Sequence, residues 1–180
     1  LGLRLDSDSY SGNVSGAASV ASVTPSYVYD KGRLHADLGL KISKVITDTA
    51  TSPFVFNAKE QILYPDVSVR FSLIREALLF YAKVGGGNRV YSNADLIEHN
   101  IWLYGNDMGI GIERLSAKAG FEGRIGSRFS WNIHAGYADY ASALVDVADP
   151  YAWIWTDAPS SVGYAPYKTW DGTLEWLWKS

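Results

Sequence analysis

The chain has 180 residues, no Cys, a formal net charge of -3 at pH 7 and 14% aromatic residues. The lack of Cys excludes disulfides and Cys-ligated metal sites, the acidic balance argues against a nucleic-acid partner, and the aromatic content argues against disorder. The sequence has no apolar run of about 18 residues, which excludes a membrane-spanning helix. The mean hydropathy of -0.07 is typical of a soluble protein, but a transmembrane β-barrel alternates apolar and polar residues and has a similar average.

Alternation of apolar and polar residues predicts β-strands along most of the chain. In chain order, the expected strands cover residues 1–10, 21–30, 33–46, 62–73, 77–89, 114–125, 129–137 and 167–179, and the alternation is clearest in 33–46, 114–125 and 129–137. We therefore expect about eight strands, several of them roughly 12 to 15 residues long, against a usual length of about 5 to 6. Tilted by about 45°, such strands are long enough to cross a bilayer.

Short and long connections alternate between the expected strands. The short ones are Lys31-Gly32, Arg75-Glu76 and Gly126-Ser127, whereas the long ones cover residues 11–18, 48–60, 90–108 and 145–166. Outer-membrane barrels have this asymmetry, with short turns on the periplasmic side and long loops outside. The sequence begins at Leu1 without a leader segment, which favours a mature chain or a piece cut from a longer one. Either way, we expect residues 1–180 to form a single domain.

Aromatic residues gather next to the short turns and at the end of the last expected strand. They are Tyr27, Tyr29, Phe71, Phe80, Phe121, Phe129, Trp131, Trp176 and Trp178. In a barrel they would form a girdle at the level of the lipid headgroups. The alternative is the core of a β-sandwich, which also uses aromatic side chains.

The opposite face of the expected strands is polar and charged. Its candidates for a barrel lumen are Arg33, His35, Asp37, Lys41, Asp66, Arg70, Lys83, Arg114, Lys118, Glu122, His134 and Glu175. Both signs of charge occur, so neighbouring strands can pair them. For any single residue, an ordinary solvated sheet face explains the charge equally well, and only the whole set is informative.

Signals for catalysis and metal binding are weak. The three His residues, His35, His99 and His134, lack ligand spacing, and His134 and Asp139 are expected on opposite faces of one strand. The Gly85-Gly86-Gly87 run lacks the residues of a phosphate-binding loop and suggests a bent strand. Residues 92–105 are expected to include a short helical turn with Asp95 in its first turn. Five aromatic residues in or beside the long connections are candidate contacts for a ligand or partner: Tyr91, Trp102, Tyr104, Trp153 and Trp155.

Two stretches resemble TonB-dependent-receptor-like outer-membrane β-barrel proteins. They are YPDVSVRFSL (64–73) with LLFYAKVGGGNRVYSNADLIEHNIWL (78–103), and GIERLSAKAGFEGRIGSRFSWNIHAGYADYAS (111–142). The resemblance covers roughly Tyr64 to the C-terminus and implies a Gram-negative outer-membrane barrel of more than eight strands. The sequence shows no plug domain or TonB box, so no functional residue is transferred.

The leading hypothesis is an all-β, antiparallel up-and-down transmembrane barrel in the cell outer membrane. Without enzymatic activity or a cofactor, it would act as a transport channel or receptor-like barrel, or as a membrane component of an envelope complex, with lipid and other envelope proteins as partners. A soluble β-sandwich that binds glycans is the alternative, and a barrel-embedded hydrolase is a third hypothesis. Either the eight strands close on themselves, or the two end strands continue a larger barrel.

Overall fold

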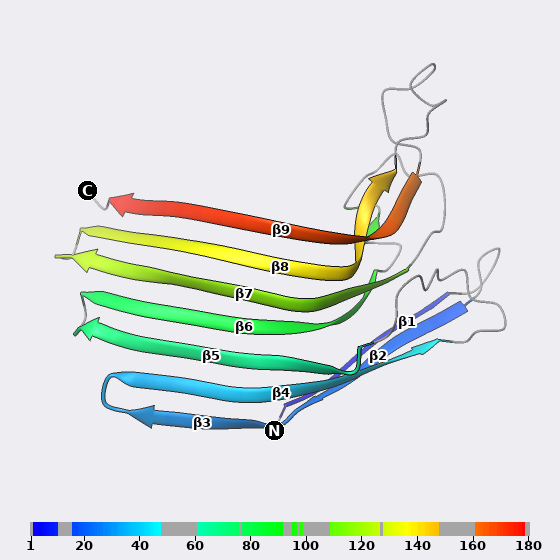
Figure 1. Cartoon of the computed structure of the whole chain (residues 1–180), viewed down its shortest axis with the longest axis horizontal. Helices are drawn as coiled ribbons and strands as arrows, with labels where there is room; N and C mark the ends of the chain where they lie inside the picture. The colour runs from blue at the N-terminus through cyan, green and yellow to red at the C-terminus, as the bar shows by residue number, and fades with distance from the viewer. Residues whose placement is uncertain are drawn as a thin grey trace, which may run out of the picture.

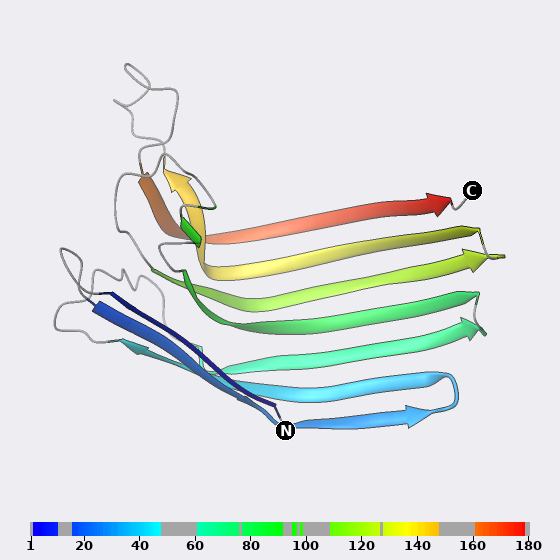
Figure 2. The same ribbon diagram turned by 180° about the vertical axis from the view of Figure 1, so that it is seen from behind.

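The structure is a computed structural model that describes residues 2–10, 16–47, 61–75, 77–91, 95, 96, 98, 109–126, 128–147 and 161–178. Its strands all belong to one antiparallel sheet (Figures 1 and 2). They are β1 (Gly2–Tyr10), β2 (Gly16–Thr24), β3 (Ser26–Lys31), β4 (Leu34–Thr47), β5 (Leu63–Ile74), β6 (Leu78–Tyr91), β7 (Gly109–Ile125), β8 (Phe129–Val147) and β9 (Ser161–Trp178).

The sheet has an up-and-down order and is eight strands wide. Neighbours follow the order β1-β2-β4-β5-β6-β7-β8-β9, and β3 also pairs with β4. The expected strand over 21–30 is interrupted at Pro25, because proline has no N–H for the ladder. Its carbonyl still accepts a hydrogen bond from the Leu40 N–H at 3.1 Å, so β2 and β3 lie end to end along β4. The predictions of an all-β fold and of about eight strands are confirmed.

Three tight turns join strands at one end of the sheet, as the sequence predicts. The first comprises Gly32 and Arg33 rather than Lys31-Gly32, because Lys31 is paired with Leu34. Gly32 and Gly126 have φ values of 64° and 63°, in the left-handed region that glycine adopts without a Cβ penalty. The expected start of a strand at Arg33 is therefore wrong by one residue.

Four strands are longer than predicted, and three of them extend into the connections expected over 11–18 and 145–166. β2 begins at Gly16, β7 at Gly109 and β9 at Ser161, and β8 continues to Val147. In β8 and β9 the alternation is lost because the register shifts. Tyr140 pairs with Tyr167, but the next aligned pair is Ala143 with Ala165. Pro166 lies within this shift, where a missing N–H breaks no regular ladder bond.

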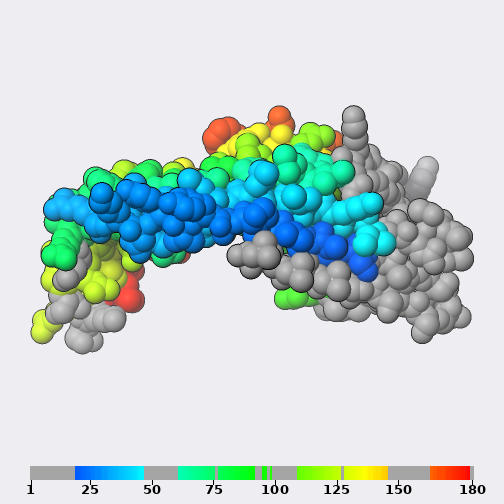
Figure 3. Space-filling view, turned by 90° about the horizontal axis from the view of Figure 1, so that it is seen from below, coloured from blue at the N-terminus to red at the C-terminus, as the bar shows by residue number. Residues whose placement is uncertain are grey.

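Irregular pairing runs across β6, β7 and β8 at one level. The register shifts between Gly85 and Gly87 in β6, between Ile112 and Leu115 in β7, and after Tyr140 in β8. Bulges bend strands, and β8 and β9 turn sharply in the region of these shifts (Figure 1). Viewed from its β2–β3 edge, the sheet is arched rather than flat (Figure 3).

Beyond this bend, a small apolar core joins β2, β4 and β6 to β7 and β8. β5 begins only at Leu63, so the last residues of β4 and β6 have no strand between them and pack together. Val45 packs against Val20 and Val90, and also against the cluster of Ile110, Ile112 and Ala141. The main part of the sheet therefore has a single layer, and apolar packing between layers is confined to the end with the long connections.

Among the described residues, the two outer strands have one neighbour each. β1 pairs with β2 and β9 pairs with β8, and no pairing joins β1 to β9. The sheet is open, so the eight strands do not close on themselves as one of the two expected arrangements requires.

Candidate functional site

Pairing across the sheet sorts the side chains onto two faces, because directly opposed residues in antiparallel strands share a face. From β4 to β9, the polar candidates fall on one of these, which we call the polar face. Its members from the predicted set are His35, Asp37, Lys41, Asp66, Arg70, Lys83, Lys118, Glu122, His134 and Glu175. The strand register therefore brings these ten side chains to one surface of the sheet.

Two predicted members of the set are placed differently. Arg33 lies in the first turn, and its Nη1 donates to the Leu73 carbonyl at 3.4 Å. Arg114 falls inside the bulge of β7, between Glu113, which pairs with Tyr140, and Leu115, which pairs with Asp139. The extra residue in the bulge changes the alternation, so Glu113 shares the face of Tyr140.

Polar side chains connect the strands across the middle of the polar face. The Tyr81 hydroxyl donates to Asn132 Oδ1 at 2.8 Å, and His134 Nε2 lies 3.7 Å from Asp171 Oδ2. Glycines leave room for these groups: a Cβ on Gly120 would lie 2.8 Å from the Tyr81 hydroxyl, and one on Gly136 would lie 2.3 Å from Asp171 Oδ1. Polar contacts between side chains therefore connect neighbouring and next-nearest strands on this face.

The opposite face, here the apolar face, has exposed large side chains on most strands whose burial is described. Leu38, Leu40, Ile42 and Ile46 of β4 are 44–55% exposed, whereas Ser43, on the polar face of the same strand, is 1% exposed. Other large apolar side chains that are exposed on this face are Tyr27, Tyr29, Leu63, Phe71, Phe121, Ile125, Ile133, Trp170, Leu174, Trp176 and Trp178. A soluble monomer rarely exposes so continuous an apolar surface.

Aromatic side chains form rows on the apolar face near the tight turns. Phe71, Phe80 and Phe121 occupy consecutive cross-strand positions, with 5.3 Å between the ring centroids of Phe80 and Phe121. Phe129 and Trp178 pair at 6.2 Å. These contacts are on the surface of the sheet and not between two sheets, so they do not form the sandwich core of the alternative interpretation.

A polar cavity of about 310 Å³ lies on the polar side of the bend. Its lining side chains come from four strands: Lys41 from β4, Asn88, Arg89 and Tyr91 from β6, Glu113 from β7 and Tyr140 from β8. Gly86, Gly87 and Gly111 complete the wall. The Gly85-Gly86-Gly87 run thus serves as the bent strand expected from the sequence, and a Cβ on Gly86 would lie 2.8 Å from the Tyr64 ring.

Hydrogen bonds and ring contacts fix the side chains around this cavity. Lys41 Nζ donates to the Gly86 carbonyl at 2.9 Å. Arg89 forms an ion pair with Asp95 at 2.6 Å, and its guanidinium lies 5.1 Å from the centre of the Tyr91 ring. Burial raises the pKa of the Tyr91 phenol above its ordinary value, and the charge of Arg89 opposes this change, so Tyr91 remains a neutral hydroxyl at pH 7.

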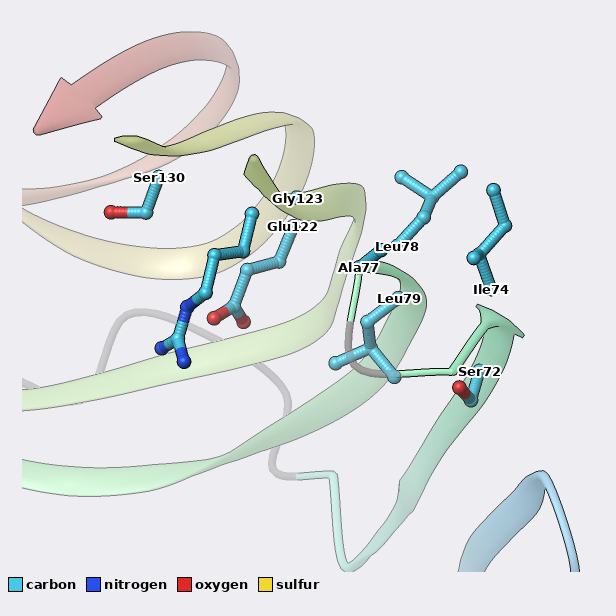
Figure 4. Close-up of a pocket in the computed structure, with 9 residues that line it drawn as sticks. Ser72, Ile74, Ala77, Leu78, Leu79, Glu122, Gly123 and Ser130 are labelled. Atoms are coloured by element: carbon cyan, nitrogen blue, oxygen red, sulfur yellow. The ribbon is translucent and has the colours of Figure 1, made fainter. Parts of the chain in front are cut away.

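A second cavity, of about 400 Å³, lies near the tight turns (Figure 4). Glu122, Arg124, Ser72 and Ser130 provide its polar lining, and Ile74, Leu78 and Leu79 provide its apolar lining. The sequence does not predict this cavity, because its lining residues come from four strands, β5 to β8, that only the register brings together.

Of the predicted loop contacts, only Tyr91 can be located. Trp102, Tyr104, Trp153 and Trp155 lie outside the described residues, as does His99. Asp95, Leu96 and Glu98 are helical, in agreement with the helical turn expected there, and Leu96 is buried. His134 and Asp139 are on opposite faces, as predicted.

The described residues contain no group of three His, Cys, Asp or Glu side chains able to hold a metal ion. In the same parts of the chain, no helix combines the length and the apolar character needed to span a membrane.

Comparison with known proteins gives no relative: no protein-family model, no curated protein and no solved structure matches this chain. The resemblance to TonB-dependent-receptor-like proteins therefore stays a prediction.

Proposed function

We propose that this sheet is the wall of a transmembrane β-barrel in a Gram-negative outer membrane, larger than the strands described here. The observation that supports the proposal is a single-layer sheet whose apolar face is exposed as well as its polar face. Large apolar side chains are exposed on one face of most strands. Most charged side chains lie on the other face, with Lys44, Asp139 and Lys168 as exceptions. Lipid contact on the apolar face would bury these apolar side chains, and water inside the barrel would solvate the charges.

Strand dimensions support the same proposal. Between the tight turns and the bulges, the strands comprise residues 78–85 in β6, 116–125 in β7 and 129–140 in β8. A tilted strand needs about 9–11 residues to cross the hydrocarbon layer. The stretches in β7 and β8 reach this length, and the stretch in β6 is one residue shorter. The rows of Phe and Trp near the turns are in the position of an interfacial aromatic girdle.

As to activity, we propose a channel or receptor-like barrel without enzymatic function, or a membrane component of an envelope complex. The polar face would line the lumen and interact with the solute, and other envelope proteins are the expected partners. The resemblance to TonB-dependent-receptor-like proteins, from about Tyr64 to the C-terminus, supports this choice.

Tryptophan fluorescence in lipid vesicles tests the membrane proposal. Trp170, Trp176 and Trp178 are 67–79% exposed on the apolar face. Lipids brominated along their acyl chains should quench the fluorescence of the inserted protein, whereas a soluble quencher such as acrylamide should have little effect. As a control, the W170F/W176F/W178F variant should lose most of the lipid quenching. Strong acrylamide quenching together with detergent-free solubility as a monomer would contradict the proposal.

The channel activity is tested separately. Protein inserted into a planar bilayer should give stepwise conductance, since a charged lumen passes ions. Inserted protein that gives no conductance would favour the role in an envelope complex over that of an open channel.

A further inference from the structure

The polar cavity at the bend contains two charges of opposite sign without an ion-pair partner. Lys41 and Glu113 are both half-buried and line the same cavity. Among the described residues, neither is within ion-pair distance of an opposite charge, whereas the third charged group, Arg89, is neutralised by Asp95. A partly buried charge without a counter-charge is unfavourable, so a bound ligand with both signs of charge would stabilise this arrangement.

The surrounding groups also suit a small charged molecule. Lys41 uses one N–H for the Gly86 carbonyl and keeps two further donors. Tyr140 is the cross-strand neighbour of Glu113, and the rings of Tyr91 and Tyr140 line the same cavity. An ammonium group next to Glu113 would also interact favourably with these ring faces.

We infer that this cavity binds a small zwitterion of the amino-acid or dipeptide type. The ligand carboxylate contacts Lys41, and its ammonium group contacts Glu113 between the two tyrosine rings. A cavity of about 310 Å³ has room for such a molecule. A neutral sugar would hydrogen-bond to the same side chains but would leave both charges uncompensated, and a simple anion or cation would compensate only one.

This inference rests on the proposed function in one respect, since it names the solute class that the polar face of the barrel recognises. Binding to protein in detergent micelles does not require a bilayer. A failure to bind therefore leaves the test of membrane insertion unaffected, and a failure to insert does not change the binding result.

Equilibrium dialysis of the purified full chain in micelles tests the inference, with radiolabelled L-alanine and L-alanyl-L-alanine as probes. N-acetyl-L-alanine lacks the ammonium group, L-alaninamide lacks the carboxylate, and glucose lacks both charges. The two zwitterions should bind at least tenfold more tightly than any of these three compounds. Equal binding of the charge-deleted analogues, preferential binding of glucose, or no binding of either zwitterion would overturn the inference.

Variants assign the two contacts. Lys41→Met should weaken L-alanine binding at least tenfold and remove the preference for L-alanine over L-alaninamide, and Glu113→Gln should do the same for N-acetyl-L-alanine. Lys44→Met, on the apolar face of β4, and Asp139→Asn, on the apolar face of β8, are the matched controls and should bind like the parent protein. If the Lys41 and Glu113 variants keep both preferences, the assignment is wrong; if either variant fails to fold by circular dichroism, the analogue series on the parent protein decides.

Discussion

Individual glycines on the polar face allow side chains from neighbouring strands to approach closely. Gly120 is the clearest case, because a Cβ there would lie 2.4 Å from the Ile133 carbonyl oxygen and 2.7 Å from His134 Cβ. Neither group can move without displacing β8. Gly172 differs, since the nearest atom to a Cβ would be 3.9 Å away.

Substituting Gly120→Ala should therefore lower the free energy of unfolding by about 1–3 kcal/mol, as overpacking does. Gly172→Ala should change it by less than about 0.5 kcal/mol. Urea unfolding of protein refolded into lipid vesicles measures both values. Equal stability of the two variants would show that β7 and β8 are not in this close register.

A single hydroxyl joins β6 to β8 across β7. Tyr81→Phe removes the 2.8 Å hydrogen bond to Asn132 and should cost about 0.5–1.5 kcal/mol. Tyr27→Phe is the control, since Tyr27 is 65% exposed on the apolar face and should be neutral within measurement error. The same unfolding experiment tests the pair, and a neutral Tyr81 variant would contradict the cross-strand bond.

At the scale of the element, β9 shows how strictly side-chain direction separates the two environments. Leu174 pairs with Ile133 on the apolar face, and the adjacent Thr173 pairs with His134 on the polar face. The two positions are at the same depth along the strand, so they differ chiefly in the medium they face.

Leu174→Arg should therefore destabilise the membrane-inserted protein by about 2–4 kcal/mol if this position is near the bilayer midplane. Thr173→Arg should be tolerated, because Asp171 and Glu175 lie on the same face. The fraction of heat-modifiable folded protein in vesicles at increasing urea measures the difference. Equal effects at the two positions would contradict a lipid-facing apolar surface.

At the scale of the whole molecule, the open edge of the sheet conflicts with a hydrocarbon surrounding. Along the described part of β9, only the side towards β8 is paired, and unpaired backbone groups in lipid cost several kcal/mol each. A barrel wall requires another strand along the free side of β9, as the proposed larger barrel provides.

Hydrogen exchange in vesicles tests this requirement. If the free side of β9 is covered, successive amides in the paired stretch of residues 169–176 should exchange as slowly as those of β6, which has neighbours on both sides. Rapid exchange at every second amide would show an open edge and would contradict a closed barrel.

Sequence alternation was sufficient to find the strands where alternation is regular. In β4, one set of positions is apolar from Leu34 to Ile42, so the strand and its two faces were predicted within one residue. In β7 and β8, bulges at Glu113 and Tyr140 change the alternation, so alternation alone does not predict where these strands end or that Arg114 lies in a bulge. Alternation also does not predict the cavity at the bend, because Lys41 and Glu113 come to line it only through the pairing of strands β4 to β7.

The sequence by itself determined the all-β fold, the tight turns and the division into an apolar and a polar face, because each depends on local alternation and on residues such as Gly32 and Gly126. Only the tertiary structure decided that the sheet is open, that it bends along a row of bulges, and that Lys41 and Glu113 line one cavity. These features depend on the register between strands, and a shift of one residue in register reverses which face a side chain occupies.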